Sequence, residues 1–136
     1  MGFIVDTCIW VDVERGAIGV ADVTRYTGAE PVFISPVTIA ELSYGVEMAA
    51  TDAIRNHRLS ALDRLKRKPL LVIDDITGDL FGRICVSLRR KGRHARHRVQ
   101  DIWLAAQAIQ HNYSLLTRNR ADFEDIPGLQ LVVFGA

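Results

Sequence analysis

Short apolar runs alternate with amphipathic stretches along the sequence, and this pattern predicts strands separated by helices. Five runs are rich in β-branched residues and too short for helices, which favours strands that are buried on both faces. They are residues 3–5, 31–35, 70–73, 114–117 and 129–134. Strands of this kind, joined by helices, are typical of a parallel sheet between two helical layers. We therefore expect an α/β protein with three α/β/α layers and a central, mostly parallel five-stranded sheet.

Apolar residues at three- and four-residue spacing predict the helices between these strands. The expected helices cover about residues 7–13, 17–26, 36–49, 53–66, 77–90 and 99–111. Pro36 suits a first helical turn, Thr51 or Asp52 suits a helix cap, and Gly92 is a helix stop. Residues 92–98 have no apolar periodicity, and we expect them to form a basic loop.

Composition indicates one compact globular domain over residues 1–136. The chain is 49% hydrophobic and 24% charged, which is too rich in core-forming residues for a disordered protein. Its apolar runs are too short to cross a bilayer, and its first residues lack the basic start of a secretory signal. We therefore expect a cytoplasmic protein. Two cysteines, Cys8 and Cys85, make no disulfide framework and are expected to be buried free thiols.

The net charge of +1 conceals an asymmetric distribution of charge along the chain. Residues 52–98 hold 13 Lys and Arg against 5 Asp and Glu, whereas the rest of the chain holds 4 bases against 11 acids. A basic middle indicates either a polyanionic partner or simply a solvated helical surface, and charge alone does not decide between them.

Four acids stand where a parallel sheet would place a ligand, near the carboxyl ends of its strands. Asp6 ends the first predicted strand and Asp122 follows the fourth. Glu41 and Asp101 lie on predicted helices among apolar neighbours, where an unpaired carboxylate is costly. Carboxylates about 5 Å apart would repel by roughly 3 kcal/mol per pair at an effective dielectric constant of 20. A cluster would therefore require cations, of which Mg²⁺ or Mn²⁺ prefers oxygen ligands.

Each of these acids also has a structural alternative. Asp6 suits the cap of the next helix, Asp101 suits a first helical turn and Asp122 suits a loop cap. Glu41 has no such role, because it stands within a predicted helix. Asp74 and Asp75 also follow a strand, but Thr77 and Asp79 beside them indicate the start of a helix, and we assign this pair a structural role.

Four sequence blocks together carry a family resemblance. They are IVDT at residues 4–7, TIAELSYG at 38–45, QDIWLAAQA at 100–108 and LTRNRADF at 116–123. In this order and spacing they resemble the PIN-domain ribonucleases, specifically the VapC-type toxins of type II toxin–antitoxin systems. Each block alone is weak, but the resemblance extends over essentially the whole chain. The Arg- and His-rich segment before Asp101 is more basic than is usual in the family.

The resemblance implies a PIN-like fold and a Mg²⁺- or Mn²⁺-dependent endoribonuclease that hydrolyses RNA phosphodiester bonds. It implies a homodimer and a cognate antitoxin partner. By match to the motifs, the catalytic and metal-binding residues would be Asp6, Glu41, Asp101 and Asp122, with Asp6 and Asp101 as the principal ligands. Thr7, Thr117 and Asn119 would give polar support.

The basic segment before Asp101 has the composition of an RNA-binding arm. Its side chains would neutralise phosphates, and its histidines would stack on bases. The candidate RNA-binding residues are Arg89, Arg90, Lys91, Arg93, His94, Arg96, His97 and Arg98. The alternatives are a solvated arm and one that meets acidic partner residues. A zinc site at His94 and His97 is disfavoured, because no cysteine pair accompanies them and bases surround them.

Other functions remain open from the residues alone. A DNA nuclease or another phosphodiesterase would use the same acids, and a catalytically silent nucleic-acid-binding module would resemble this chain in charge. No Ser-His-Asp or Cys-His pattern is present. The apolar stretch around Trp10 is expected to pack in the core, with a surface for an antitoxin helix as the alternative.

Overall fold

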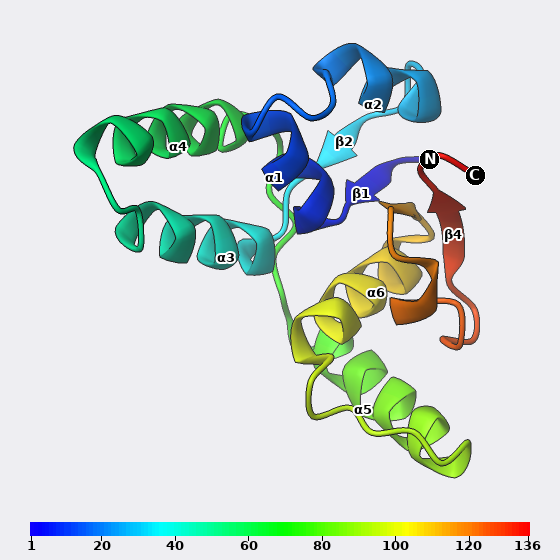
Figure 1. The fold of residues 1–136 in the computed structure, drawn as a ribbon. Helices are drawn as coiled ribbons and strands as arrows, with labels where there is room; N and C mark the ends of the chain where they lie inside the picture. The colour runs from blue at the N-terminus through cyan, green and yellow to red at the C-terminus, as the bar shows by residue number, and fades with distance from the viewer.

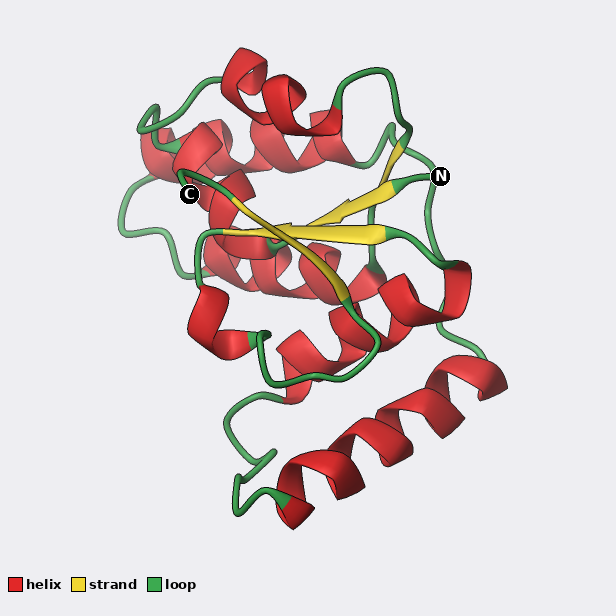
Figure 2. Cartoon of the chain, turned by 90° about the vertical axis from the view of Figure 1, so that its right-hand side faces the viewer, coloured by secondary structure: helices red, strands yellow, loops and turns green.

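The computed structural model describes all residues from 1 to 136 and has a parallel sheet with helices packed on both of its faces (Figures 1 and 2). The strands are β1 (Phe3–Val5), β2 (Val32–Phe33), β3 (Ser114–Thr117) and β4 (Gln130–Val133). The helices are α1 (Thr7–Glu14), α2 (Val20–Thr27), α3 (Pro36–Glu47), α4 (Asp52–Leu65), α5 (Asp75–Arg90) and α6 (Val99–His111), with a 3-10 turn, η1, at Arg120–Asp122. None of the helices is long and apolar enough to span a membrane.

All strand pairings are parallel, in the order β2-β1-β3-β4. The two central strands come from opposite ends of the sequence, with Phe3 opposite Ser114 and Val5 opposite Leu116. Every carboxyl end therefore lies at the same edge of the sheet. Because β1 and β3 are adjacent, the segments that follow them, beginning at Asp6 and Arg118, leave this edge side by side.

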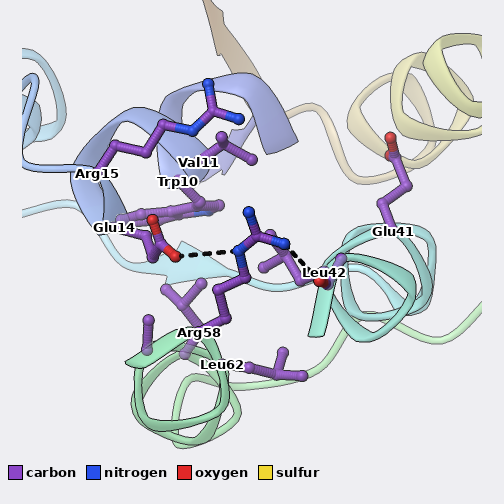
Figure 3. Close-up of a pocket in the computed structure, with 11 residues that line it drawn as sticks. Trp10, Val11, Glu14, Arg15, Glu41, Leu42, Arg58 and Leu62 are labelled. Carbon is purple, nitrogen blue, oxygen red and sulfur yellow. Dashed lines mark hydrogen bonds and ion pairs between the residues drawn. The ribbon is translucent and has the colours of Figure 1, made fainter. Parts of the chain in front are cut away.

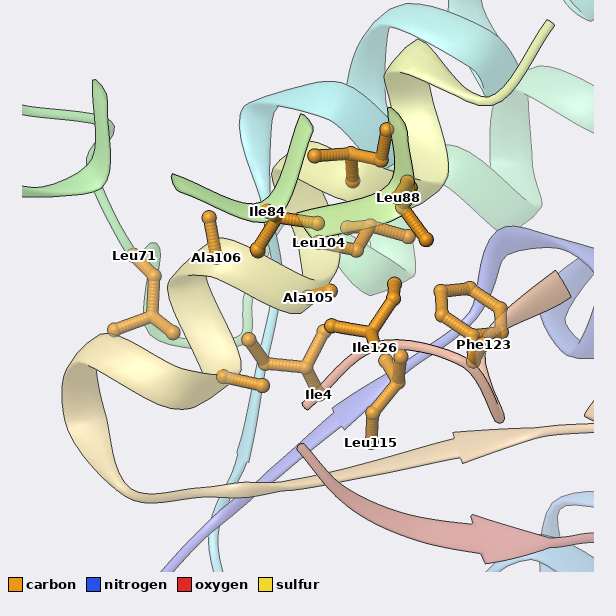
Figure 4. Packing of buried hydrophobic residues seen from close by; sticks show 12 residues of the cluster. Ile4, Leu71, Ile84, Leu88, Leu104, Ala105, Ala106, Leu115, Phe123 and Ile126 are labelled. Carbon is orange, nitrogen blue, oxygen red and sulfur yellow. The ribbon is translucent and has the colours of Figure 1, made fainter. Parts of the chain in front are cut away.

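Successive side chains along each strand point to opposite faces of the sheet, and the buried residues therefore form two clusters. Ile4 and Leu115 face α5 and α6 in the larger cluster (Figure 4), whereas Val5 and Leu116 face α1 and α2 in the smaller one, which also buries Trp10. Both faces of the sheet are covered, as the continuous apolar strands predicted. Trp10 is 6% exposed, so it packs in the core as expected.

The prediction of five strands is wrong, because residues 70–73 do not form a strand. The segment makes only a single parallel bridge, between Leu70 and Ile34. The Gln107 side chain of α6, which is fully buried, donates from Nε2 to the Leu71 carbonyl at 2.8 Å. This contact takes a backbone acceptor that a strand partner would use. Leu71 is buried, but Val72 is 62% exposed, so the apolar run is not the inside of a sheet.

Local signals place the helix starts largely as predicted. Ser35 accepts a hydrogen bond from the backbone of Val37, and Thr51 accepts one from Ile54, so both hydroxyls cap helices. Asp74 caps α5 through a reciprocal pair of hydrogen bonds with Thr77, which confirms its structural role. The predicted α6 matches its observed bounds, and Asn112 ends it in the left-handed conformation. Cys8 and Cys85 are free thiols, and both are partly buried.

Candidate active site

Asp6 stands at the carboxyl end of β1 with only 6% of its surface exposed. It occupies the position before α1, yet its side chain makes no cap hydrogen bond there. Instead its Oδ2 accepts from the Thr117 hydroxyl at 2.8 Å and from the Cys8 thiol at 3.3 Å. The carboxylate is therefore held by the end of the adjacent strand β3 and is not used as a helix cap.

Glu41 reaches the same region from the second turn of α3. Its Oε1 lies 3.0 Å from the Thr7 hydroxyl, which is also 3.0 Å from the hydroxyl of Thr38. Thr7 is the first residue of α1 and directly follows Asp6. A buried pair of threonine hydroxyls thus fixes Glu41 relative to the end of β1.

Asp101 and Asp122 approach from the other side of the sheet edge. Asp101 lies in the first turn of α6 and is half-buried, and Asp122 ends the turn η1 that follows β3. Figure 1 shows this orange segment between β3 and β4, beside α6. Phe123, which is completely buried in the larger core cluster, anchors the segment immediately after Asp122.

The electrostatics show that the four acids act on one another. Burial, together with the negative charges of Asp6, Asp122 and Glu41, raises the pKa of Asp101 to about 7, while Arg98 opposes the shift. Burial is also the main cause of the raised pKa of Asp6, which Thr117 partly offsets by its hydrogen bond. Burial likewise raises the pKa of Glu41, with Asp6 adding to the shift. The folded chain therefore holds negative charge here against burial and mutual repulsion.

A divalent cation fits this donor set, although the side chains as they stand form no complete cage. No group of three or more His, Cys, Asp or Glu residues is close enough to hold a metal ion alone. Mg²⁺ does not need such a cage, since it usually keeps several waters and binds through one or two carboxylates together with substrate phosphates. Oxygen ligands and carboxyl groups with raised pKa values are the properties of a site for a hard cation.

The predicted polar residues have unequal parts in this arrangement. Thr7 and Thr117 bind acids directly through their hydroxyls. Asn119 contributes its backbone amide, which donates to the Thr117 hydroxyl oxygen at 3.0 Å, while its side chain is exposed. Two contributors were not expected from the sequence, the hydroxyl of Thr38 and the thiol of Cys8. Burial and the negative charge of Asp6 raise the pKa of Cys8 to about 12, so the thiol keeps the proton that it donates to Asp6.

The candidate RNA-binding residues divide into free and engaged side chains. Lys91, Arg93 and Arg98 all contact Asp125, which lies three residues beyond the end of η1. Arg89, Arg90 and Arg96 are exposed and form no ion pair. His94 and His97 are also exposed, on the loop between α5 and α6. The side chains available to a ligand are therefore those of the end of α5 and of the outer part of the loop.

A separate apolar groove opens between α1, α3 and α4 (Figure 3). Its floor includes Trp10, Leu42 and Leu62, and Glu41 contributes to its lining. Arg58 of α4 spans the groove, with its Nε 3.5 Å from Glu14 Oε1 and its Nη1 donating to the Gly45 carbonyl at 2.7 Å. The groove therefore leads along the surface to one of the four acids.

Comparison with known proteins places this chain in one family. The sequence profile of the PIN domain matches residues 3–129. The chain belongs to the PIN-domain family.

Two similar relatives are both named as VapC ribonucleases. The chain is 31% identical over 133 residues to Ribonuclease VapC of Rickettsia bellii, covering 97% of this chain and 96% of that protein. It is 30% identical over 125 residues to Ribonuclease VapC5 of Mycobacterium tuberculosis, covering 92% and 87%. Among solved structures, VapBC2 from Rickettsia felis bound to a DNA fragment from its promoter matches with a TM-score of 0.84, at 25% identity and 98% coverage of both chains.

Proposed function

We propose that the protein is a metal-dependent endoribonuclease and the toxin of a toxin–antitoxin pair. The observation that carries the proposal is the group of acids at the carboxyl edge of β1 and β3, in which Asp101 has a pKa raised to about 7 by burial and by three other carboxylates. The relatives named ribonuclease support RNA as the substrate. The solved relative combines such a chain with a second protein, which supports an antitoxin partner.

The chain's own residues would bind and orient the reacting groups. Asp6 and Asp101 would hold Mg²⁺ or Mn²⁺, and Glu41 and Asp122 would bind its waters or complete its ligands. When bound, the ion would offset charge on the scissile phosphate and increase the acidity of a bound water. Thr117 keeps the Asp6 carboxylate oriented, and Thr7 does the same for Glu41. A buried Asp6 limits competition from bulk water.

Cleavage assays with and without metal test this proposal. The wild-type protein should cut RNA with Mg²⁺ or Mn²⁺, lose the activity in EDTA and leave DNA of the same sequence intact. Asp6→Asn should be about 10³-fold slower, since the contribution of a metal to the barrier is several kcal/mol. Asp63→Asn, which changes an exposed acid of α4, is the matched control.

Each alternative function has its own outcome in this assay. Metal-dependent cleavage of DNA rather than RNA would identify a DNA nuclease. Binding of RNA without cleavage under any metal would identify a silent nucleic-acid-binding module. Cleavage that persists in EDTA would refute the mechanism.

The exposed basic residues support an RNA-binding arm that leads to the acids. Arg89, Arg90, Arg96, His94 and His97 are free to contact phosphates and bases, whereas the roles of Lys91, Arg93 and Arg98 in RNA binding compete with their contacts to Asp125. The arm joins α5 to the first turn of α6, which carries Asp101. RNA bound along it would therefore be directed to the site.

Charge removal at Arg90 and Arg96 tests the arm. The double variant Arg90→Gln/Arg96→Gln should bind single-stranded RNA more weakly, and the slope of log affinity against log salt should fall by roughly 1.4, at about 0.7 for each phosphate contact. Binding measured over a series of salt concentrations checks this. Arg64→Gln/Arg67→Gln removes the same charge from the α4 region and should leave the slope unchanged. Equal slopes for the arm variant and the wild type would show that the arm does not contact RNA phosphates.

The groove between α1, α3 and α4 is the surface that we propose for the antitoxin. It is apolar at its floor, and it has both an acid and a base at its margin. These properties suit an amphipathic segment, which would bury apolar side chains and pair its charges. A segment lying there would reach Glu41, so binding would also obstruct the proposed active site.

Gly45 offers a position from which a side chain can enter the groove. It lines the groove on α3, and a Cβ added there would meet no atom within 4 Å. Gly45→Trp should leave RNA cleavage intact and weaken inhibition by the cognate antitoxin by about 30-fold or more, the effect of losing one hot-spot contact. Gly82→Trp, on an equally open position of α5, is the control. Normal inhibition of Gly45→Trp would place the antitoxin elsewhere.

Two further expectations remain predictions. Homodimerisation is implied by the family, and exposed apolar side chains such as Val72 and Ile76 leave apolar area for contact with a second copy. A cytoplasmic location accords with an RNA substrate.

A further inference from the structure

A junction of charged groups lies at Asp125, outside the four acids. The Asp125 carboxylate accepts two hydrogen bonds from the Arg98 guanidinium, from Nη1 to Oδ2 at 2.8 Å and from Nη2 to Oδ1 at 2.7 Å. Arg93 adds a contact to Oδ2 at 3.2 Å, and Lys91 Nζ donates to the Asp125 carbonyl at 2.7 Å. The Asp125 side chain is only 7% exposed and that of Arg98 only 16% exposed. This is a bidentate, largely buried pair and not a surface ion pair.

The junction joins the two chain segments that carry Asp101 and Asp122. Arg98 is the residue before α6 and stands three positions ahead of Asp101. Asp125 stands three positions after Asp122, and Arg98 Nη2 also donates to the backbone carbonyl of Asp122. One planar guanidinium therefore spans from the start of α6 to the segment that follows β3.

The two segments need such a connection because the charges that they carry repel each other. Asp101 in the first turn of α6 and Asp122 in η1 are both carboxylates beside the same edge of the sheet, so without a metal their like charges favour separation. The neighbouring Phe123 anchors one end of the turn that carries Asp122 in the core. A rigid fork between Arg98 and Asp125 adds a second attachment that opposes this separation, whereas a lysine would hold the carboxylate only as a point charge.

We infer that Arg98 and Asp125 form a positioning pair, which fixes the Asp122 segment against the first turn of α6 and so sets the spacing of Asp101 and Asp122 for metal binding. The inference rests on the proposed function, in which these acids bind the ion. It gives Arg98 a role different from RNA contact, because its guanidinium is already occupied by Asp125 and by the Asp122 carbonyl.

Metal affinity measured apart from catalysis tests the pair. Mn²⁺ binding is titrated calorimetrically in the absence of RNA for the wild type, Arg98→Lys and Asp125→Asn. Both variants should bind Mn²⁺ about 10- to 100-fold more weakly, the usual effect of losing a group that orients a metal ligand. RNA cleavage should need correspondingly more Mn²⁺ and recover towards the wild-type rate at saturation. The double variant should bind no more weakly than the weaker single one, because the two residues act through one contact.

Arg55→Lys is the matched control, since Arg55 also pairs with a carboxylate, that of Glu47 at 3.0 Å, but on the exposed surface. It should leave Mn²⁺ affinity unchanged. Thermal unfolding of every variant identifies those that remain folded. Arg98→Lys is included because it keeps the positive charge beside Asp125 and is therefore the junction variant expected to remain folded.

The first outcomes below would overturn the inference, and the last would refute the proposed function alone. Folded variants with wild-type Mn²⁺ affinity would show that the pair does not set the site, and a lowered unfolding temperature alone would make it a stabilising contact only. A reduced salt dependence of RNA binding with unchanged Mn²⁺ affinity would assign Arg98 to RNA. A wild-type protein that binds Mn²⁺ but does not cleave RNA would refute the proposed function alone, because the affinity comparison would still decide the role of the pair.

Discussion

Replacing Asp101 with asparagine should abolish RNA cleavage and at the same time raise the unfolding temperature of the metal-free protein. The loss of activity should be about 10³-fold or more, because Asp101 is one of the two acids expected to hold the ion. The gain in stability follows from the cause of its raised pKa. Burial and three neighbouring charges oppose ionisation of Asp101 in the folded chain, and asparagine removes that unfavourable charge.

The gain should depend on pH in a defined direction. The folded protein holds a proton on Asp101 up to a pH of about 7, whereas the unfolded chain releases it near pH 4. The stability that wild-type Asp101 contributes in its neutral form is therefore full below pH 4 and is lost as the pH rises through 7. The advantage of Asp101→Asn should be small at pH 5 and larger at pH 8.

Differential scanning calorimetry in EDTA at both pH values measures this effect, and an RNA cleavage assay measures the loss of activity. Asp63→Asn, at an exposed position of α4, should change neither property. An asparagine variant that unfolds at a lower temperature than the wild type at pH 8 would show that Asp101 is stabilised by a partner in the metal-free fold. Retained cleavage would remove Asp101 from the site.

Phe123→Ala should cause the largest loss of stability among single core changes close to the site. Phe123 is completely buried beside Ile126 and Leu115 (Figure 4). Truncation of a buried phenylalanine leaves a cavity and costs about 3–5 kcal/mol, a large part of the stability of a domain of this size. The Phe123 ring also holds the chain immediately after Asp122, so the same change frees an acid of the site.

Urea unfolding followed by circular dichroism measures the loss. Val86→Ala removes a side chain that is 48% exposed on α5 and should change the free energy of unfolding by less than about 0.5 kcal/mol. Phe123→Leu should retain most of the stability, because it keeps an apolar group of similar size in place. If Phe123→Ala lowered the free energy of unfolding by less than about 1 kcal/mol, the Phe123 ring would not be needed to hold this part of the core together.

Much of the fold could be predicted from the sequence, because local signals agree with the packing. Helix α6 is an example, since its apolar face and its end at Asn112 are both encoded nearby. The segment 70–73 shows where such reasoning fails. Its apolar composition matches that of a buried strand, but a side chain 36 residues away, that of Gln107, binds the Leu71 carbonyl. No local pattern contains that contact.

The acids proposed for the site could be singled out from the sequence for a similar reason, but the side chains that hold them in place could not. Asp6 is marked by its place at the end of a strand, and Glu41 by its charge on an otherwise apolar helix face. The pairing of Arg98 with Asp125 spans 27 residues, and Arg98 is one of six similar bases in its segment. The sequence therefore indicated a basic arm, but it did not distinguish Arg98, whose side chain pairs within the protein, from the bases whose side chains face solvent.

The adjacency of β1 and β3 determines when activity can first arise during synthesis. Strand β1 is synthesised well before its partner β3, which begins only at Ser114, and the segment that carries Asp122 follows β3. The nascent chain cannot assemble all four acids until residues up to Asp122 have emerged from the ribosome. A nuclease built in this order would remain inactive towards the messenger and the ribosome that are producing it until this late segment has been made.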